Sequence, residues 1–245
     1  MKRFNNKQSS GDISFAWSLC IGFILAILFC VPLFVSAQTY HVKFQTDRGN
    51  FTVMLYDGTP IHRDNFVNLV KRGFYDGIIF HRVIESFMIQ AGDSATRNAQ
   101  PGVVYGDEEN ARTLPAEILY PRYYHKRGAL AAAREGDDVN PERRSSSTQF
   151  YIVWGRMHSP GQLERIRKNN QRTLKQPFEI PDSICEQYYF PGGTPWLDGQ
   201  YTVFGEVTEG LEAIEEIQLV MTDENDRPLS DVKILKAELV EAKEQ

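Results

Sequence analysis

The chain has 245 residues, of which 42% are hydrophobic and 24% are charged, and its formal net charge is −5. A chain of this length forms one domain with additions or two small domains. Its apolar content and 12% aromatic residues exclude an intrinsically disordered protein. The acidic balance argues against a nucleic-acid-binding protein, which carries a basic face. Three cysteines are too few for a disulfide-stabilised scaffold.

The N-terminal segment has the layout of an export signal. Three basic residues precede an uncharged, mostly apolar run over 15–37, which ends in Ser36-Ala37. This order is typical of a secretory signal peptide, but the run is also long enough to span a bilayer. We expect 1–37 to be a signal peptide cleaved after Ala37 or a retained anchor, with a buried core helix as the third interpretation. Residues 38–245 then form one exported, periplasmic domain.

Cys185 is the only cysteine outside this N-terminal segment, because the other two are Cys20 and Cys30. An exported protein meets an oxidising environment, in which thiols persist as disulfides when a partner is in reach. We therefore expect Cys185 to be a free or half-buried thiol, and pairing with a second chain is the alternative.

The remaining chain is typical of short strands with two helices. Residues 40–44 and 51–55 alternate apolar and polar side chains around a turn at 47–50 that contains a glycine, which predicts a hairpin. A helix is predicted between Thr59-Pro60, an N-cap followed by proline, and Gly73, a C-terminal stop. The same reasoning predicts a second helix over 211–217 and strands over 78–84, 87–91, 128–133, 150–153, 202–207 and 232–234.

Many short strands with two helices predict a mainly β protein, a closed barrel whose ends are covered by helices. Two stretches, 94–127 and 154–195, exceed such a barrel. The first contains three prolines and little regular pattern, and the second is charged and carries a predicted short exposed helix over 162–168. Loops of this length are usually functional, so we interpret both as insertions into one domain.

No conventional catalytic motif is present. The sequence contains no G-x-S-x-G, H-E-x-x-H, P-loop or G-x-G-x-x-G pattern. The five histidines lack the spacing of metal ligands, and Cys185 lacks the context of a cysteine protease. These absences argue against most hydrolases, kinases and dinucleotide-dependent enzymes.

The segment 80–93, F-H-R-V-I-E-S-F-M-I-Q-A-G-D, carries the most informative arginine. Strand alternation places Phe80, Arg82 and Ile84 on one face and His81 and Val83 on the other. An arginine among apolar neighbours can hold its guanidinium beside an aromatic surface. It can also extend to water from an edge strand, and the segment alone favours this second interpretation without excluding the first.

Four ordered blocks resemble the signature of the cyclophilins, the cyclosporin-type peptidyl-prolyl isomerases. They are 80–93, G-A-L-A-A-A at 128–133, S-T-Q-F-Y-I at 147–152, and W-L-D-G-Q-Y-T-V-F-G at 196–205. The similarity extends from about Tyr40 to Leu239, and the two insertions have no counterpart. It implies an eight-stranded antiparallel barrel closed by two helices, and an isomerase that uses no cofactor and no metal.

The resemblance also implies the roles of individual residues. The expected catalytic residues are Arg82, which acts as the catalytic arginine, Phe87, which lines the proline pocket, and Gln90, which orients Arg82 and binds the substrate backbone. Tyr151 replaces the usual phenylalanine, so its hydroxyl should find a partner inside an apolar pocket. The substrate-binding residues are Met88, Tyr151 and Leu197 in the proline pocket, Trp196 and Tyr201 at its edge, Ala133, Arg134 and Gln149 in the groove for residues before proline, and in addition His81.

The chemistry of this reaction suits these residue types. Rotation about a peptide bond faces a barrier of about 18–20 kcal/mol, so X-Pro bonds isomerise in tens to hundreds of seconds. In the twisted state the proline nitrogen becomes pyramidal and localises its lone pair. A fixed arginine donor aimed at that nitrogen stabilises the twisted state over the planar one.

Two functions from different classes follow. The first is an exported peptidyl-prolyl cis-trans isomerase that assists folding, and the second is a proline-binding or chaperone module with little turnover, whose insertions recognise the client. In either case we expect a monomer that binds proline-containing, unfolded or folding polypeptides and no nucleic acid. Contact with a membrane is expected only through the N-terminal segment. Trp196 favours sensitivity to a cyclosporin-type inhibitor.

Overall fold

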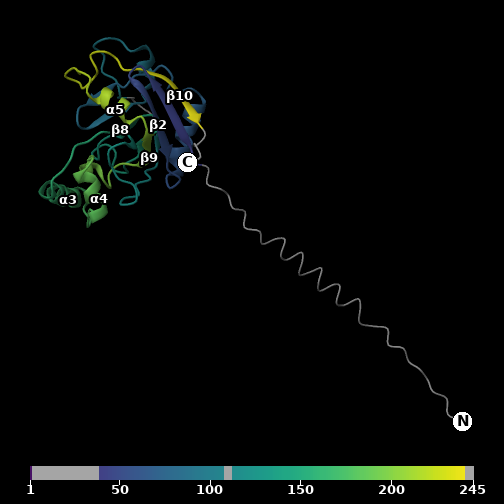
Figure 1. Cartoon of the computed structure of the whole chain (residues 1–245), viewed down its shortest axis with the longest axis vertical. Coiled ribbons are helices and arrows are strands. Elements are labelled where there is room, and N and C mark those ends of the chain that lie inside the picture. Colours follow the sequence, from purple (N-terminus) through teal and green to yellow (C-terminus); the bar gives the residue numbers. More distant parts are fainter. Residues whose placement is uncertain (2–38, 108–111, 241–245) are drawn as a thin grey trace. The chain divides into compact units, whose positions relative to one another are not determined.

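The structure is a computed structural model that describes Met1, residues 39–107 and residues 112–240. The predicted signal peptide or anchor and its cleavage point after Ala37 lie outside these ranges. Within the described part of the chain, no helix is both long and apolar enough to cross a bilayer. The segment Thr39–Gln245 gathers into one unit, and Figure 1 shows its strands and helices.

The first two strands form the predicted hairpin. β1 (His41–Thr46) pairs antiparallel with β2 (Gly49–Leu55), and Thr46 stands opposite Gly49. Gly49 has a φ of +117°, which glycine adopts without strain. The Thr46 hydroxyl donates to the Gly49 carbonyl oxygen at 2.6 Å. The turn residues therefore set the register of the two strands.

Eight strands form one antiparallel sheet in the order β10-β1-β2-β9-β6-β8-β4-β3. The strand predicted over 78–84 is shorter than expected, and the strand predicted over 232–234 begins only at its last residue and is much longer. The other strands lie close to their predicted positions. The bounds are β3 (Arg82–Ile84), β4 (Met88–Ala91), β6 (Ala129–Ala132), β8 (Phe150–Val153), β9 (Val203–Glu209) and β10 (Ile234–Val240).

Hydrogen bonds connect the two edges of this sheet. Within the described ranges, β3 and β10 do not pair with each other along their length. Hydrogen bonds instead join the residues just before β3 to those at and just before the start of β10. The Phe80 amide donates to the Val232 carbonyl at 2.9 Å, and the Ile234 amide donates to the Ile78 carbonyl at 2.8 Å. The predicted eight-stranded architecture is thus present as a curled antiparallel sheet with these contacts between its edges.

The two predicted helices cover the core. α2 (Pro60–Lys71) and α5 (Leu211–Gln218) turn Phe66 and Ile214 toward the buried side chains of the strands. Phe66 lies at the centre of an aromatic cluster, which accounts for much of the apolar surface that the sheet and α2 bury together. The ring centroids of Phe44, Tyr75, Phe150 and Phe204 lie within 6.3 Å of the Phe66 centroid.

The N-terminus of α2 is capped by a residue that the sequence pattern does not indicate. Thr59, the predicted N-cap, makes no capping hydrogen bond through its side chain and donates instead to the Tyr56 carbonyl. The Glu117 carboxylate accepts from the amides of Ile61 and His62 at 3.1 and 2.9 Å. A carboxylate satisfies unpaired amides and is favoured by the helix dipole. The first insertion therefore holds α2 in place.

The second insertion builds a small core of its own. α3 (Pro160–Leu174) is longer than the helix predicted over 162–168. Its start is fixed by the N-cap Ser159, which forms a capping box with Gln162 in the first turn. α4 (Asp182–Tyr189) has no counterpart among the predicted elements, since its eight residues give a weak periodic signal. Figure 1 shows the two helices side by side. Buried Leu163, Ile184 and Tyr188 join them, and Cys185 is a half-buried free thiol beside this cluster.

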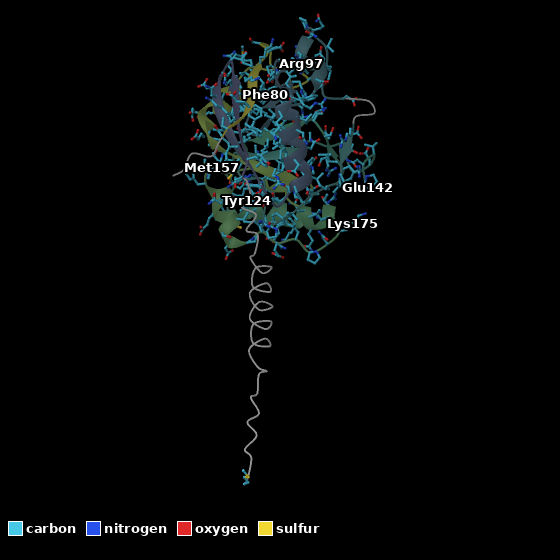
Figure 2. The ribbon with its side chains drawn as sticks, turned by 90° about the vertical axis from the view of Figure 1, so that its right-hand side faces the viewer. Phe80, Arg97, Tyr124, Glu142, Met157 and Lys175 are labelled. Atoms are coloured by element: carbon cyan, nitrogen blue, oxygen red, sulfur yellow. The ribbon has the colours of Figure 1, made fainter. Side chains whose placement is uncertain are left out.

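The described residues of the first insertion contain little regular structure. They comprise η1 (Ser94–Asn98) and β5 (Thr113–Leu114), and β5 pairs with β7 (Ser145–Ser146). Phe80 is fully buried, whereas Met157 of the second insertion is 60% exposed; both are labelled in Figure 2. Both insertions therefore pack around the sheet and leave its core to the strands and the two covering helices.

Candidate active site

A cavity of about 280 Å³ opens on the face of the sheet opposite to the aromatic core, beside β3, β4, β6 and β8. Its apolar floor includes Met88 and Tyr151, which are 2% and 4% exposed. The lining contains every predicted site residue except Gln149 and Trp196. The lining residues that the sequence predicted are His81, Arg82, Phe87, Met88, Gln90, Ala133, Arg134, Tyr151, Leu197 and Tyr201.

Arg82 lies at the edge of this cavity with a half-exposed side chain. Its Nε donates to Asp226 Oδ2 at 3.3 Å, and the Val83 amide donates to the Asp226 carbonyl at 2.8 Å. Neither terminal nitrogen of Arg82 has a hydrogen-bond partner among the described residues. The guanidinium is therefore held at one nitrogen while its fork of donors stays available. Asp226 was not predicted, since it lies 144 positions further along the chain.

The strand alternation predicted around Arg82 is wrong for two residues. Phe80 packs in the aromatic core together with Val83, whereas His81 lines the cavity together with Arg82. The reason is that β3 begins only at Arg82, so the two-residue period does not extend to Phe80 and His81.

Gln90 stands opposite Arg82 in the strand register, but its side chain has a different partner. Its Nε2 donates to Gln149 Oε1 at 3.0 Å, and Gln149 Nε2 donates to the Gly106 carbonyl at 2.9 Å. Gln149 orients Gln90 by this contact, and the role of Gln90 toward Arg82 stays a prediction. Gln149 lines a second, polar cavity of about 360 Å³, which shares Gln90, Ala133 and Arg134 with the first.

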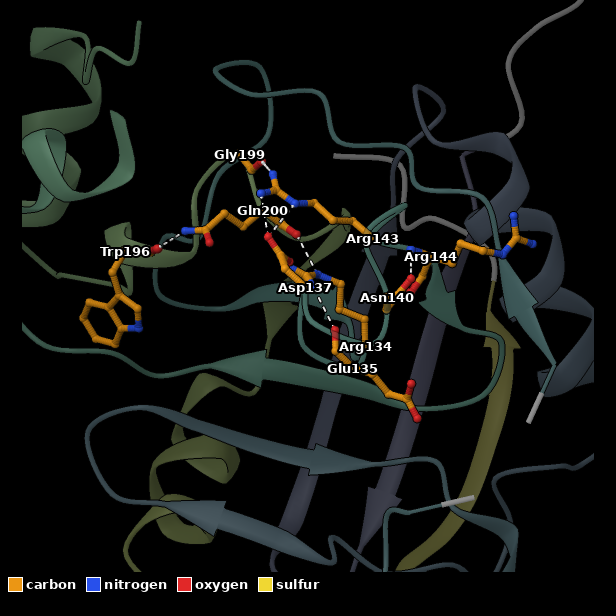
Figure 3. Close-up of polar contacts among 9 residues, drawn as sticks. All are labelled: Arg134, Glu135, Asp137, Asn140, Arg143, Arg144, Trp196, Gly199 and Gln200. Carbon is orange, nitrogen blue, oxygen red and sulfur yellow. Dashed lines mark hydrogen bonds and ion pairs between the residues drawn. The ribbon is translucent and has the colours of Figure 1, made fainter. Parts of the chain in front are cut away.

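Arg134 lines both cavities, and its side chain is buried at their border. Figure 3 shows its guanidinium within a set of polar contacts that join residues 134–144 to residues 196–200. Its Nε donates to the Gln200 carbonyl at 2.9 Å, and its NH2 pairs with Asp137 at 2.7 Å. The guanidinium also lies over the Tyr201 ring, 4.4 Å from the centroid. The side chain of Arg134 therefore fixes the pocket edge, in addition to lining the groove.

Trp196 stands behind Phe87 and not in the cavity wall. The two ring centroids are 5.7 Å apart, and the guanidinium of Arg156 lies 5.7 Å from the Trp196 ring centroid. Trp196 thus packs against the pocket residue Phe87, and its predicted role at the pocket edge stays a prediction. Trp196 is half-buried.

The predicted partner of the Tyr151 hydroxyl is present and is a histidine. His125 Nε2 lies 2.9 Å from this hydroxyl, and both groups are buried. His125 comes from the end of the first insertion, and the sequence offered no signal for it because no metal or catalytic spacing surrounds it.

His81 is buried beside the cavity without a partner for either ring nitrogen in the described part of the chain. Burial lowers the pKa of His81 from 6.5 to about 4; the nearby Asp93 opposes this shift and Arg82 adds to it. The ring is therefore neutral at pH 7 and does not repel the adjacent guanidinium. No group of three or more metal-ligating side chains gathers among the described residues.

Residues of the first insertion complete the cavity. Tyr105, Gly106 and Asp107 form part of the wall of this cavity, next to the predicted site residues. Gly106 and Asp107 also line the second cavity. Only the length of the insertion signalled a functional role. The Gly106 amide donates to the buried Asp93 carboxylate at 2.8 Å, which explains how an irregular segment is held against the sheet.

Comparisons with known proteins identify this arrangement. Residues 41–239 match the family described as cyclophilin type peptidyl-prolyl cis-trans isomerase/CLD. Putative peptidyl-prolyl cis-trans isomerases of Staphylococcus epidermidis and Staphylococcus aureus are each 35% identical over 195 residues, covering 79% of this chain and 88% of theirs.

A solved structure of a cyclophilin type peptidyl-prolyl cis-trans isomerase from Cryptosporidium parvum has a TM-score of 0.58 at 22% identity. It covers 83% of this chain and 99% of its own. The same protein, in the presence of the dipeptide Ala-Pro, has a TM-score of 0.57, with 82% of this chain and 99% of its own covered. At this identity the likeness concerns the fold.

The chain belongs to the cyclophilin-type peptidyl-prolyl cis-trans isomerases, as its motifs predicted. Membership assigns the reaction, which is isomerisation of the peptide bond that precedes proline. It also assigns the kind of partner, because the family binds proline-containing peptides.

The buried His81 makes the stability of the fold sensitive to acid. Below pH 6.5 the His81 ring becomes protonated in the unfolded chain, whereas in the folded chain it stays neutral down to about pH 4 because its pKa is lowered. Stability is therefore complete above pH 6.5 and falls as the pH is lowered to 4, by up to about 3 kcal/mol from this residue. Urea unfolding at pH 7 and pH 4.5 measures the loss.

His81→Asn should lose less stability than the wild type between these two pH values. His41→Asn, on the half-buried first strand, serves as the control. Burial also lowers the pKa of His62 and of His158, so part of the acid sensitivity should persist in His81→Asn. An unchanged pH dependence in that variant would show that His81 is not a source.

Asp226 should act as a positioning residue for Arg82. Asp226→Asn keeps the shape and tolerates the positive φ of 62° at this position, but it removes the charge that holds Nε. An exposed ion pair contributes up to about 1 kcal/mol, so kcat/KM for an Ala-Pro test peptide should fall about two- to fivefold. Asp64→Asn, which breaks a surface ion pair of Arg63 on α2, should have no effect, and an equal lack of effect in Asp226→Asn would contradict the role.

Proposed function

We propose that the cavity beside Arg82 is the active site, and that Arg82 donates to the proline nitrogen as the X-Pro bond twists. The observation that carries this proposal is the pairing of Arg82 through Nε alone, which leaves its terminal donors free beside a buried apolar floor. The apolar floor takes the proline ring, and Met88, Tyr151 and Leu197 form it. Phe87 closes the side next to Trp196.

The reaction needs no bond to break, so the residues act by position and charge. The twisted state carries a localised lone pair on nitrogen that the planar states lack, and a donor aimed at it lowers the barrier selectively. The floor excludes water that would compete for the guanidinium, which strengthens this hydrogen bond. Gln90, held by Gln149, offers its remaining amide groups to the substrate backbone.

The second cavity is suited to the residues that precede proline. It continues from the first past Gln90 and Ala133 and ends among polar side chains that include Asn140, Arg144 and Gln149. We therefore expect extended polypeptides to bind across both cavities, as unfolded or folding chains do. Sensitivity to a cyclosporin-type inhibitor stays a prediction from Trp196, and the monomeric state stays an expectation.

We further propose that the enzyme works after export, with 1–37 removed as a signal peptide. The support is the order of basic residues, apolar run and small residues at Ser36-Ala37. The acidic domain that remains is then released to the periplasm and not held at a membrane.

Removal of Arg82 should abolish most of the catalysis. Loss of one fixed donor to a developing charge costs about 10²–10³-fold in rate, so Arg82→Ala should lower kcat for cis-to-trans conversion of an Ala-Pro test peptide by this factor. Arg48→Ala, in the exposed turn between β1 and β2, is the control and should match the wild type. No acceleration by the wild type would overturn the proposal and favour a proline-binding module.

Processing of the N-terminus can be read directly. The protein recovered from the cells that produce it should begin at Gln38 by mass spectrometry. Ala37→Phe places a bulky residue where a small one is required and should block cleavage, whereas Ser36→Leu changes the unrestricted middle position and should not. Full-length wild-type protein in the membrane fraction would instead establish an anchor.

A further inference from the structure

A buried chain of polar groups runs from the second insertion to the floor of the proline pocket. The Tyr188 hydroxyl of α4 donates to Asp198 Oδ2 at 2.6 Å. Asp198 Oδ1 lies 2.9 Å from His125 Nδ1, and His125 Nε2 lies 2.9 Å from the Tyr151 hydroxyl. Only Tyr151 lines the cavity, and all four side chains are at most 4% exposed.

Asp198 is the centre of this network. It accepts three hydrogen bonds, from the Tyr188 hydroxyl, the His125 amide at 2.9 Å and His125 Nδ1, because a carboxylate can only accept. His125 Nε2 pairs with the Tyr151 hydroxyl, which can donate or accept. Every polar atom that these side chains bury is satisfied, as a buried network requires.

The network also limits how the Tyr151 ring can move. The ring lies 6.0 Å from Tyr201, edge to face, and His125 makes the same kind of contact with Tyr201 at 6.2 Å. With the hydroxyl held by His125, the ring cannot rotate toward the cavity without leaving a buried donor unpaired, which is costly. A phenylalanine at this position would have no such tether.

We propose that Tyr188, Asp198 and His125 are positioning residues for Tyr151, and that the second insertion thereby braces the proline pocket from behind. Tyr188 is the contribution of α4, which packs beside α3 outside the sheet (Figure 1). The insertion therefore acts on the chemistry although none of its α4 residues reaches the cavity. This inference rests on the proposed active site.

A second route from Asp198 to the pocket has to be separated from the first. Asp198 follows Leu197, which lines the cavity directly. If Tyr188 acted through Leu197, its effect would not depend on the Tyr151 hydroxyl. If it acts through His125, deleting the Tyr151 hydroxyl removes the connection, and the two hydroxyl deletions become non-additive.

The test is a double-mutant cycle of Tyr188→Phe, Tyr151→Phe and both together. Each change removes one hydroxyl and keeps the ring, so the fold is preserved, and unfolding temperatures are measured in parallel. Tyr188→Phe should lower kcat/KM for an Ala-Pro test peptide about three- to tenfold, chiefly by raising KM, because the proline ring seats less well. In the Tyr151→Phe background the same change should have no further effect.

Tyr120→Phe is the matched control. Tyr120 also belongs to the cluster around α3 and α4, but its hydroxyl donates to the Glu179 carbonyl at 2.7 Å, outside the network. It should leave kcat/KM unchanged even if it lowers the unfolding temperature. Multiplicative effects of the two network deletions, or an effect of Tyr188→Phe no larger than that of Tyr120→Phe, would overturn the inference.

The inference can be tested separately from catalysis. The same variants can be titrated with the Ala-Pro dipeptide by NMR, and the dissociation constants should show the same non-additivity. A wild type that binds the dipeptide but does not accelerate isomerisation would sink the proposed enzyme activity and leave the coupling measurable. Equal affinities in the wild type and Tyr188→Phe would refute the bracing of the pocket.

Discussion

Successive side chains of a strand point to opposite faces of a sheet, and in this protein the two faces do different work. On β8, Phe150 and Ile152 pack in the aromatic core, whereas Tyr151 and Val153 belong to the cluster under the cavity. A side chain of the pocket floor thus shares its backbone with side chains locked in a close-packed interior. The packing of the core therefore fixes the position of the pocket floor, and the other side chains of the site are arranged around that floor.

A half-exposed cation beside a buried apolar floor is the main electrostatic feature of the site. The Arg82 side chain is 43% exposed, whereas Met88 and Tyr151 of the floor are buried. The neighbouring His81 is buried and neutral at pH 7, since burial lowers its pKa. The guanidinium therefore stands at the boundary between solvent and the apolar floor, next to a histidine that does not repel it.

Both insertions make specific contacts with the rest of the domain. Glu117 of the first caps α2, and Tyr105 to Asp107 complete the cavity wall. In the second, Tyr188 reaches the buried Asp198. Each insertion supplies hydrogen-bond partners to polar groups elsewhere in the domain: the amides at the start of α2 in one case and the Asp198 carboxylate in the other. These contacts join each insertion to residues that are distant from it in the sequence or lie outside it.

Local patterns were sufficient for the hairpin at Gly49, helix α2 and the strand at β8, because turn chemistry, helix punctuation and alternation act between neighbours in the chain. The four sequence blocks at 80–93, 128–133, 147–152 and 196–205 likewise identified the family and together hold most of the cavity lining. Three contacts were decided by the tertiary structure alone. Asp226 pairs with Arg82, Glu117 and not Thr59 caps α2, and His125 forms the hydrogen bond with the Tyr151 hydroxyl. Those partners are separated by 144, at least 55 and 26 positions. Only folding brings such groups together, since no local period or propensity links one to the other.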